Sequence, residues 1–400
     1  MSQSSARPCA VAIVTSFVLS LAFGPGCTVR LEAGTYHTRQ QVVQGFRGTF
    51  SGAGSDRTII EPLAPLRVSQ DENVLARPPS VENPWPILFL FIDADMDVRD
   101  LGFRVTPPEV TETWTIFGME IRVLATLLSI TGERSRVDVE RVAMESGEGT
   151  FMGVNVINGI FVQGVLPGPS GGFGDRPPFE GTVTIRDSVS RGPDCGVCVE
   201  NLQRATVRLL DNRFDGVLSV YIENVSESLV EVRGNELTGS EAAAFVSAGG
   251  LRTPEGPGTV VIAGNTLRTG PEGHGVLISD TGDRPTLQVL AEGNLLELEE
   301  ATAAVGGGAT SVVVRGNVIR GSAAAGMRVG AAPHPETASG DDPEAPPAAL
   351  GWVLLDNDVS ALRADVAPIW VTDGATGTIV ACRAGTDVRD EGVATTLACD

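Results

Sequence analysis

The sequence predicts an all-β fold, a single-stranded right-handed parallel β-helix (solenoid) of about a dozen coils. Three observations predict it. One motif recurs along the chain, with 23 residues between its copies at Asn212 and Asn235. Each copy has the pattern of a short strand followed by a tight corner. Glycine and proline are abundant, at 48 and 25 of 400 residues, whereas aromatic residues make up only 5%. The chain length divided by the repeat length sets the approximate number of coils.

The repeated motif has two apolar residues separated by one, a spacer, Gly or Asp, an asparagine, any residue and an apolar residue. Its clear copies contain Asn212, Asn235, Asn265, Asn294, Asn317 and Asn357. Degenerate copies upstream have Leu101, Val142 and Ser188 in the asparagine position. Alternating apolar residues predict a strand with one inward face, and Gly-Asn or Asp-Asn predicts a corner, because asparagine tolerates left-handed backbone and glycine adopts it freely. Stacking would then let each asparagine amide hydrogen-bond to the next, which is a structural role.

The charge balance excludes several partners. The chain has 29 basic and 50 acidic residues, a formal net charge of −21, and it contains no lysine. Binding to nucleic acid or to an anionic membrane surface needs a concentrated basic patch, so neither partner is expected. Mechanisms that use lysine as a base or as a Schiff-base nucleophile are also excluded.

The amino-terminal segment 1–26 is predicted to be a secretory signal peptide or an N-terminal capping helix, leaving 27–400 as the β-helix domain. Residues 10–23 are apolar and uncharged and follow Arg7, as in signal peptides. The run is too short for a confident membrane span, so none is expected in the mature chain. The protein is therefore expected to be secreted or in the cell envelope. Lipid attachment at Cys27 is the weaker alternative, because Gly24 stands where a lipobox usually has leucine.

The cysteines predict no zinc site. Cys195 and Cys198 have the spacing of a redox motif but lack a helix start and a nearby histidine, so they are interpreted as two thiols. Cys382 and Cys399 could form a disulfide if the chain is exported to an oxidising compartment.

The segment TVRLEAGTYHTRQQVVQGFRGTFSGAGSDRTII at 28–60 resembles the first strands of right-handed parallel β-helix proteins of the pectin-lyase-like superfamily. The resemblance implies this fold over roughly 28–380. Members of this superfamily include polysaccharide lyases and polygalacturonase-type hydrolases, so the resemblance implies these two activities as candidates. Gly273-His274-Gly275 and Asp194-Cys195 are similar to elements of those hydrolases. The sequence departs from them at Pro193, where a second aspartate is usual, and in having no lysine.

A second strand is expected downstream of each asparagine corner, and its third residue should point outward. The residues predicted in this outward position are Phe161, Cys198, Tyr221, Phe245, Leu277, Ala304, Arg328 and Trp370. We interpret Phe161, Tyr221 and Phe245 as a platform for sugar rings. The neighbouring polar residues expected to contact hydroxyl groups are Gln163, Glu200 and Glu223. In the alternative interpretation, long edge loops at 164–180 and 331–350 fold over this face and bury the aromatic rings.

Candidates for catalysis and metal binding are weaker. The catalytic candidates are Asp194, Glu200, Glu223, His274 and Arg328. Asp93, Asp95 and Asp97 alternate, so one strand face could bind Ca²⁺, although a solvated acidic turn is the default interpretation. Val98 and Arg104 stand where an EF-hand needs glycine and glutamate, which excludes that motif. No cofactor is required.

Three functions remain open at this point. The first is an exported, non-catalytic protein that binds carbohydrate or a cell-envelope partner through the aromatic face. The second is a polysaccharide lyase or glycoside hydrolase acting at the same face. The third is a structural spacer or adhesin. The incomplete catalytic motifs favour binding over catalysis.

Overall fold

The computed structural model describes most of the chain. The described residues are 26–63, 87–105, 114–116, 119–121, 123–146, 155–164, 178–247, 256–279, 287–308, 311–330, 349–373 and 375–399. The predicted signal peptide or cap at 1–26, and the predicted edge loops at 164–180 and 331–350, lie almost entirely outside them. The chain divides into two compact units, Met1–Val217 and Leu218–Asp400, which we describe separately.

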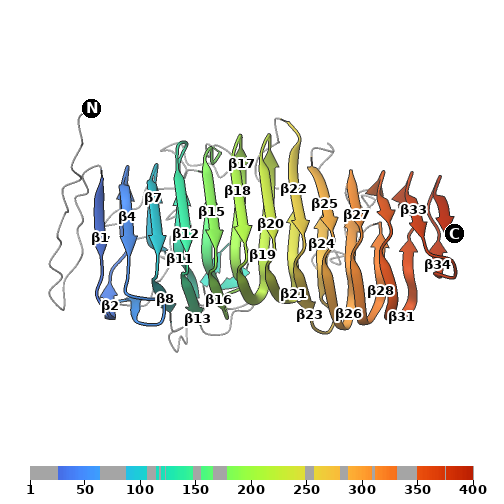
Figure 1. Cartoon of the computed structure of the whole chain (residues 1–400), viewed down its shortest axis with the longest axis horizontal. Helices are drawn as coiled ribbons and strands as arrows, with labels where there is room; N and C mark the ends of the chain where they lie inside the picture. The colour runs from blue at the N-terminus through green and yellow to red at the C-terminus, as the bar shows by residue number, and fades with distance from the viewer. Residues whose placement is uncertain are drawn as a thin grey trace. The chain divides into compact units, whose positions relative to one another are not determined.

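In the first unit, one sheet contains one strand from each successive coil (Figure 1). Its strands, in order, are β1 (Cys27–Arg30), β4 (Arg47–Ser51), β7 (Asp95–Arg99), β12 (Arg136–Glu140), β15 (Thr182–Arg186) and β18 (Thr206–Leu210). Two further rows of strands complete the coils. One row contains β2 (Gly34–Thr38), β5 (Thr58–Pro62), β8 (Gly102–Val105), β13 (Ala143–Ser146), β16 (Val189–Arg191) and the start of β19 (Arg213–Ser226). The other contains β3 (Gln41–Gln44), β6 (Ile87–Ile92), β11 (Val123–Thr131), β14 (Asn155–Gln163) and β17 (Cys195–Gln203).

The second unit repeats this arrangement. Its corner-preceding sheet contains β20 (Leu229–Arg233), β22 (Gly258–Ala263), β25 (Leu287–Glu292), β27 (Val312–Arg315), β30 (Val353–Leu355), β33 (Ile379–Cys382) and β35 (Thr396–Cys399). The strands that follow the corners are β21 (Glu236–Ser247), β23 (Thr266–Thr269), β24 (His274–Ser279), β26 (Leu295–Gly308), β28 (Val318–Val329), β31 (Asp358–Val371) and β34 (Val388–Asp390). Two short strands, β29 (Ala349–Leu350) and β32 (Ala375–Thr376), pair separately.

Each unit is therefore a stack of β-helical coils, and the predicted right-handed parallel β-helix is confirmed. Strand pairs between coils are parallel, with six coils in the first unit and seven in the second among the described strands of the corner-preceding sheet. The described residues include one antiparallel strand pair, β9 (Trp114–Ile116) with β10 (Met119–Ile121). No described segment forms a helix long and apolar enough to cross a membrane.

Alternation along each strand places branched aliphatic side chains inside the coils. In β12, Val137 and Val139 are fully buried while their neighbours face outward. At the amino-terminal end of the first unit, four aromatic rings fill the interior. Phe50 stacks on Phe89 with ring centroids 5.5 Å apart, and Phe103 meets Phe89 edge-on at 5.7 Å. Burial of these apolar surfaces is the main stabilising contribution to the fold.

Corners depend on the residue immediately before each asparagine position. Gly264, Gly293 and Asp356 have φ values of 64°, 60° and 51°. Asp187 in the degenerate copy at Ser188 has φ 52°. The expectation that asparagine shares the left-handed conformation was wrong for these corners, because the preceding Gly or Asp takes it alone and thereby turns the asparagine side chain inward.

The inward asparagines form a hydrogen-bonded ladder within the second unit. The Asn265 side-chain Nδ2 donates to Asn294 Oδ1 at 3.0 Å, and Asn294 Nδ2 donates to Asn317 Oδ1 at 2.9 Å. The amides of Asn265, Asn294, Asn317 and Asn357 each also donate to a backbone carbonyl of the preceding coil, as Asn294 does to Ile262 at 2.9 Å. Asn235 and Asn357 are the described ends of this ladder. All of its members are buried, so each amide relies on its neighbours for its hydrogen bonds.

In the first unit the ladder is only partly built. Asn212 Oδ1 accepts the backbone N–H of Ser188 at 3.0 Å, and its Nδ2 donates to the Ile185 carbonyl at 2.9 Å. One coil earlier, Ser188 Oγ lies 3.2 Å from the Val142 backbone N–H and accepts it. A hydroxyl thus replaces the amide at Ser188, and an apolar side chain replaces it at Val142 and at Leu101.

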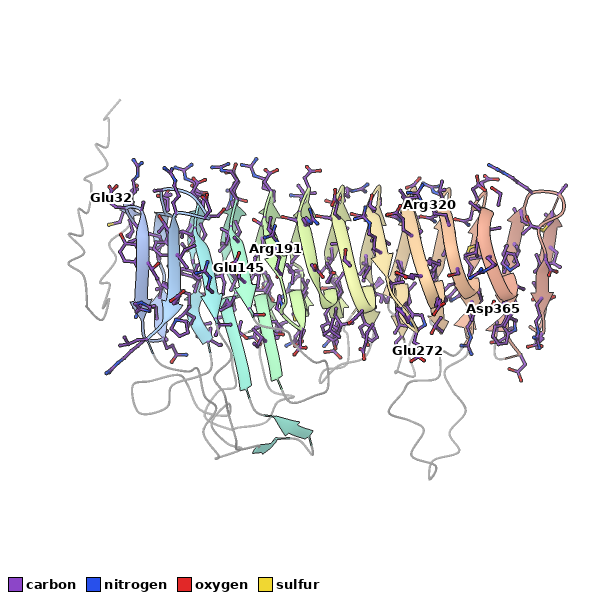
Figure 2. All side chains as sticks on the ribbon, turned by 90° about the horizontal axis from the view of Figure 1, so that it is seen from below. Glu32, Glu145, Arg191, Glu272, Arg320 and Asp365 are labelled. Atoms are coloured by element: carbon purple, nitrogen blue, oxygen red, sulfur yellow. A yellow bond between two sulfur atoms is a disulfide. The ribbon has the colours of Figure 1, made fainter. Side chains whose placement is uncertain are left out.

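A column of alternating charges runs along the outward side of the strands that follow the corners. Arg104 lies 3.4 Å from Glu61 and 3.1 Å from Glu145, and Glu145 is in register with Arg191 (Figure 2). In the second unit, Arg268 lies 3.7 Å from Glu236 and 2.7 Å from Glu297, and Glu297 also pairs with Arg320. Because these pairs are exposed, each stabilises the fold by well under ~1 kcal/mol, but their order disfavours a one-coil slip.

Replacing Asn294 with alanine should destabilise the second unit by about 2 to 4 kcal/mol, since buried hydrogen-bonding groups on both neighbouring coils lose their partner. Denaturant unfolding, with hydrogen exchange of the Asn265 amide as a local probe, measures the effect. Asn158→Ala is the matched control, because Asn158 is a half-buried asparagine of the first unit outside the ladder, and its contacts with Thr126 and Cys198 are both at 3.5 Å. Equal midpoints for the two variants would contradict a stabilising ladder.

Candidate functional site

In the second unit, one outward position per coil is aligned with the next, and we call this row of residues the outward column. Strand register aligns Phe245 with Leu277, Leu277 with Gly306, and Gly306 with Arg328. It continues from Arg328 to Trp370 and from Trp370 to Arg389. The side chain of Tyr221, on β19, stacks on Phe245 and begins the column in this unit.

The predicted membership of this column was correct for Phe245, Leu277, Arg328 and Trp370, but wrong for Ala304. Gly306 occupies the column, and Ala304 is fully buried. The error arises because β26 consists mostly of small residues from Ala301 onward and its register shifts between Leu298 and Ala301. Alternation of large and small side chains therefore gave no signal for the register.

Tyr221 and Phe245 form a parallel stack. Their ring centroids are 5.3 Å apart and their planes differ by 2°. One face of each ring is therefore covered by the other. Glu223 lies two residues after Tyr221 on the same strand. Burial raises the pKa of the Glu223 carboxyl, and a hydrogen bond with Tyr221 partly opposes this shift.

At the other end of the outward column, Trp370 lies between two arginines. The Arg328 guanidinium carbon is 4.8 Å from the indole centroid and that of Arg389 is 5.2 Å away. The indole Nε1–H donates to Glu391 at 3.1 Å, and Arg389 also donates to Glu391 at 2.8 Å. Both cation–π contacts orient the guanidinium groups. Partial burial lowers the pKa of Arg328, but an arginine remains charged at neutral pH.

His274 lies beside the position where the outward column lacks a side chain. A Cβ atom added to Gly306 would be 3.5 Å from His274 Cδ2, an ordinary van der Waals distance, and 3.3 Å from the Ala303 Cβ, so the imidazole packs directly beside this glycine. Burial, with a smaller contribution from the charge of Arg328, lowers the pKa of His274 to about 4. The imidazole is therefore neutral at pH 7, where it can accept a proton or a hydrogen bond.

In the first unit, the predicted ligand-binding residues have internal partners. Phe161 is half-buried and is in register with Ser129 on one side and Cys198 on the other. Gln163 is 5% exposed, and its Nε2 donates to Ser129 Oγ at 3.3 Å. Glu200 is half-buried and is in register with Gln163.

Asp194 is buried in the first unit and joins two coils. Its Oδ2 accepts the Ile157 backbone N–H at 3.1 Å, and its own N–H donates to the Ile157 carbonyl at 2.7 Å. The structure thus places this carboxyl against backbone rather than on the outward surface.

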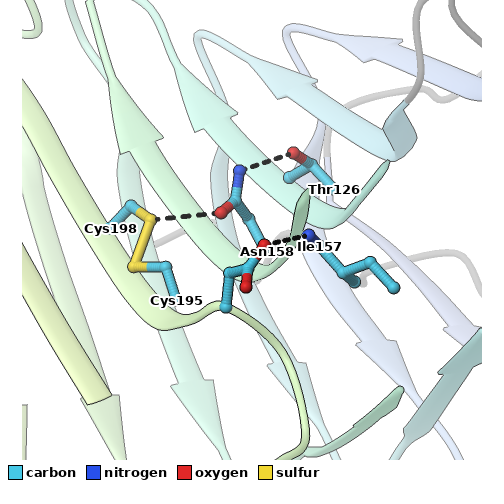
Figure 3. The surroundings of a disulfide bond; sticks show 6 residues. Thr126, Ile157, Asn158, Cys195 and Cys198 are labelled. Atoms are coloured by element: carbon cyan, nitrogen blue, oxygen red, sulfur yellow. Dashed lines mark hydrogen bonds between the residues drawn. A yellow bond between two sulfur atoms is a disulfide. The ribbon is translucent and has the colours of Figure 1, made fainter. Parts of the chain in front are cut away.

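The cysteines are paired, contrary to the interpretation of Cys195 and Cys198 as thiols. These two residues form a disulfide beside Asn158 (Figure 3). The Asn158 Oδ1 atom lies 3.5 Å from the Cys198 sulfur, and its Nδ2 lies 3.5 Å from Thr126 Oγ1. Both cysteines are buried, and their Cα atoms are 5.9 Å apart, which is closer than three residues of fully extended strand would place them. The predicted disulfide between Cys382 and Cys399 joins β33 to β35.

The three aspartates considered for calcium do not point to one place. Asp93 is at a corner with φ 51°, and its Oδ1 accepts the Glu133 backbone N–H at 3.0 Å. Asp95 and Asp97 are exposed on β7, where Asp95 is in register with Arg47 and Arg136. Over the described ranges, no group of three or more His, Cys, Asp or Glu side chains is arranged to hold a metal ion.

Of the five catalytic candidates, only His274 and Arg328 are brought together. Glu223 belongs to the same unit but lies four coils from Arg328, about 19 Å at 4.8 Å per coil. Asp194 and Glu200 belong to the first unit. Sequence reasoning missed Gly306 and Arg389 as members of the outward column, and Glu391 as the hydrogen-bond partner of Trp370 and Arg389. The repeat motif does not mark the coil after Trp370, so no pattern in the sequence assigns Arg389 to the column.

Comparison with known proteins identifies similar folds but no family. No family model matches the chain, and no curated protein does. Among solved structures, the chain is similar to the A-module of an Azotobacter vinelandii mannuronan C-5 epimerase, with a TM-score of 0.46, 11% identity, and 95% and 92% of the two chains covered. It is also similar to the Dettilon tailspike protein, with a TM-score of 0.42, 12% identity and coverage of 93% and 62%. DFA-IIIase from Arthrobacter chlorophenolicus gives a TM-score of 0.40, 13% identity and coverage of 93% and 74%. At these identities the similarity concerns the fold alone.

The imidazole of His274 should titrate near pH 4, and the stability of the fold should depend on it. The unfolded chain takes up this proton near pH 6.5 and the folded chain only near pH 4. Stability is therefore unaffected above pH 6.5 and falls by about 3 kcal/mol as the pH drops through this window. Heteronuclear NMR measures the titration, with His274→Gln identifying the resonance. A midpoint near 6.5 would contradict the buried, neutral imidazole.

Proposed function

We propose that this β-helix protein binds carbohydrate through the outward column of the second unit, without cleaving it. The observation that supports this proposal is the column itself. Tyr221, Phe245, Arg328 and Trp370 project from different coils on one side of the unit. An extended polymer that lies along the coil stack could contact one such side chain after another.

The two ends of the outward column favour different ligand groups. The Tyr221–Phe245 pair has apolar ring edges, and Glu223 two residues further along the strand has a carboxyl that can accept hydrogen bonds from sugar hydroxyl groups. This combination suits the apolar and hydroxyl faces of a sugar ring. At the other end, the guanidinium group of Arg328 lies over the face of Trp370, and its positive charge suits a negatively charged substituent. Arg389, which lies over the same ring, is ion-paired with Glu391.

We place this binding outside the cytoplasm, in the secreted fraction or the cell envelope. The disulfides Cys195–Cys198 and Cys382–Cys399 support this setting, because disulfides persist in oxidising compartments. An intact-mass measurement of the native protein, which reveals cleavage after the apolar segment 10–23, tests it.

Tyr221→Ala should weaken glycan binding about tenfold, or about 1.4 kcal/mol, the size of an aromatic contact that is lost. A glycan array followed by calorimetry on the best ligand measures it. Tyr36→Ala is the matched control, because Tyr36 is the other tyrosine of the chain and bonds to the Glu32 carbonyl at 3.1 Å in the first unit. If the two variants keep the same glycan profile as the wild type, the proposed surface is wrong.

Cleavage at the same surface is the second candidate, and the pairing of neutral His274 with cationic Arg328 favours it. A neutral imidazole can accept a proton while a guanidinium holds an anionic group. The binding proposal expects no new reducing ends and no unsaturated products when the wild type is incubated with acidic and neutral polysaccharides. Turnover that disappears in His274→Gln, with binding retained, would replace binding by cleavage as the function.

A further inference from the structure

A different face of the second unit has an unusual chemistry. In the corner-preceding sheet, the middle outward residue of five successive coils is aliphatic. We call this set the aliphatic row, and its members are Val261, Leu290, Val313, Val353 and Ile379. Val261 is 8% exposed, the next three are half-buried, and Ile379 is 43% exposed.

The equivalent row in the first unit is polar. Its members, in order along the sheet, are Thr49, Asp97, Asp138, Thr184 and Arg208. Outward positions of a solvated sheet are normally polar, and the inward positions of both units are already aliphatic. The coil interior therefore does not account for the aliphatic row. A contiguous apolar stripe on a flat sheet is typical of a surface that packs against another protein.

The period of the aliphatic row restricts what can pack on it. Its side chains repeat once per coil, about 4.8 Å apart. A second β-helix has the same period, so the side chains of the two rows stay in step along the whole contact. A second copy of this chain has this period, so no other protein is needed to match it.

Charges beside the aliphatic row also fit a second copy. The chain has a net charge of −21, which opposes self-association over most of its surface. Next to the row, however, the charged residues balance, with Glu231 beside Arg233 and Glu292 paired with Arg315 at 2.8 Å. This face therefore lacks the repulsion that the overall charge imposes.

We propose that the aliphatic row is the interface of a weak homodimer in which two copies pack face to face with antiparallel coil stacks. The two-fold axis lies along the strand direction, between the coils of Leu290 and Val313. Leu290 of one copy then lies opposite Val313 of the other, and Glu292 lies opposite Arg315. With parallel stacks, Glu292 would instead lie opposite the row that contains Gln288, and the ion pairing across the interface would be lost.

The size of the face indicates a modest affinity. The two-fold axis brings the coils of Val261 and Leu290 opposite those of Val353 and Val313, so four coils of the row overlap. Four coils at about 4.8 Å and a strand width of roughly 15 Å make about 300 Å² per copy, which is at the low end of interface sizes, where association is weak and transient. The dimer should therefore dominate only at high protein concentration.

Sedimentation equilibrium of the full chain from roughly 5 to 500 µM should show a reversible monomer–dimer equilibrium. Val313→Glu should shift the midpoint at least tenfold to higher concentration, because it buries an unpaired charge at the centre of the interface. Thr184→Glu, at the equivalent half-buried outward position of the first unit, is the matched control and should leave the equilibrium unchanged. Circular dichroism and thermal melting show whether each variant keeps its fold.

A wild type that stays monomeric throughout this range overturns the proposal, and so does a Val313→Glu variant that folds and dimerises like the wild type. Spin labels test the orientation. Labels at position 288 should lie close to one another in the dimer, whereas labels at position 396, four coils further along, should lie far apart. Equal distances at the two positions would contradict the antiparallel arrangement.

Discussion

The hydrogen-bonded register between successive coils is the constraint on which the rest of the structure depends. A coil of this length cannot bury its own apolar face, so it is stable only when the next coil covers it. At the asparagine corners, the buried side-chain amides also depend on the neighbouring coils for their hydrogen bonds. The amide of Asn294 bonds to Asn317 on one side and accepts from Asn265 on the other, and all three are buried. A shift of one coil by one residue would leave these amides without partners and would turn aliphatic side chains outward.

Because the register is constant, outward positions also align, and each unit acquires rows of side chains with a single chemistry. The outward column combines stacked rings with oriented guanidinium groups. The aliphatic row, on the corner-preceding sheet, is apolar, and the column of Glu236, Arg268, Glu297 and Arg320 alternates in sign. One substitution per coil is enough to build each of these surfaces, since the inward residues that hold the coil together need not change. This independence explains how one repeat can serve both as scaffold and as recognition surface.

Sequence reasoning succeeded wherever a local pattern is tied to the register. Asn265 and Asn317 could be recognised as corner residues because the motif around them is apolar, alternating and glycine-marked. The same reasoning failed for Ala304, since β26 consists mostly of small residues from Ala301 onward and its register shift between Leu298 and Ala301 has no sequence signature. It also failed for Cys195 and Cys198, whose pairing depends on Cα atoms 5.9 Å apart rather than at the spacing of an extended strand. At the candidate site, the column positions of Phe245 and Trp370 could be predicted. The stacking of Tyr221 on one face of the Phe245 ring, and the contact of Arg389 with Trp370, could not.

The amino-acid sequence by itself determined the parallel β-helix fold, the length of its coils and the inward face of each strand, because these follow from periodicity and from the left-handed backbone that Gly or Asp adopts at each asparagine corner. The tertiary structure alone decided which outward residues from coils 20 to 40 positions apart become neighbours. It placed His274 against Gly306, held the imidazole neutral by burial, and set Arg328 on the face of Trp370. Such contacts depend on the lengths of the intervening loops and on strand bends, which set the register of each coil without leaving a local pattern in the sequence.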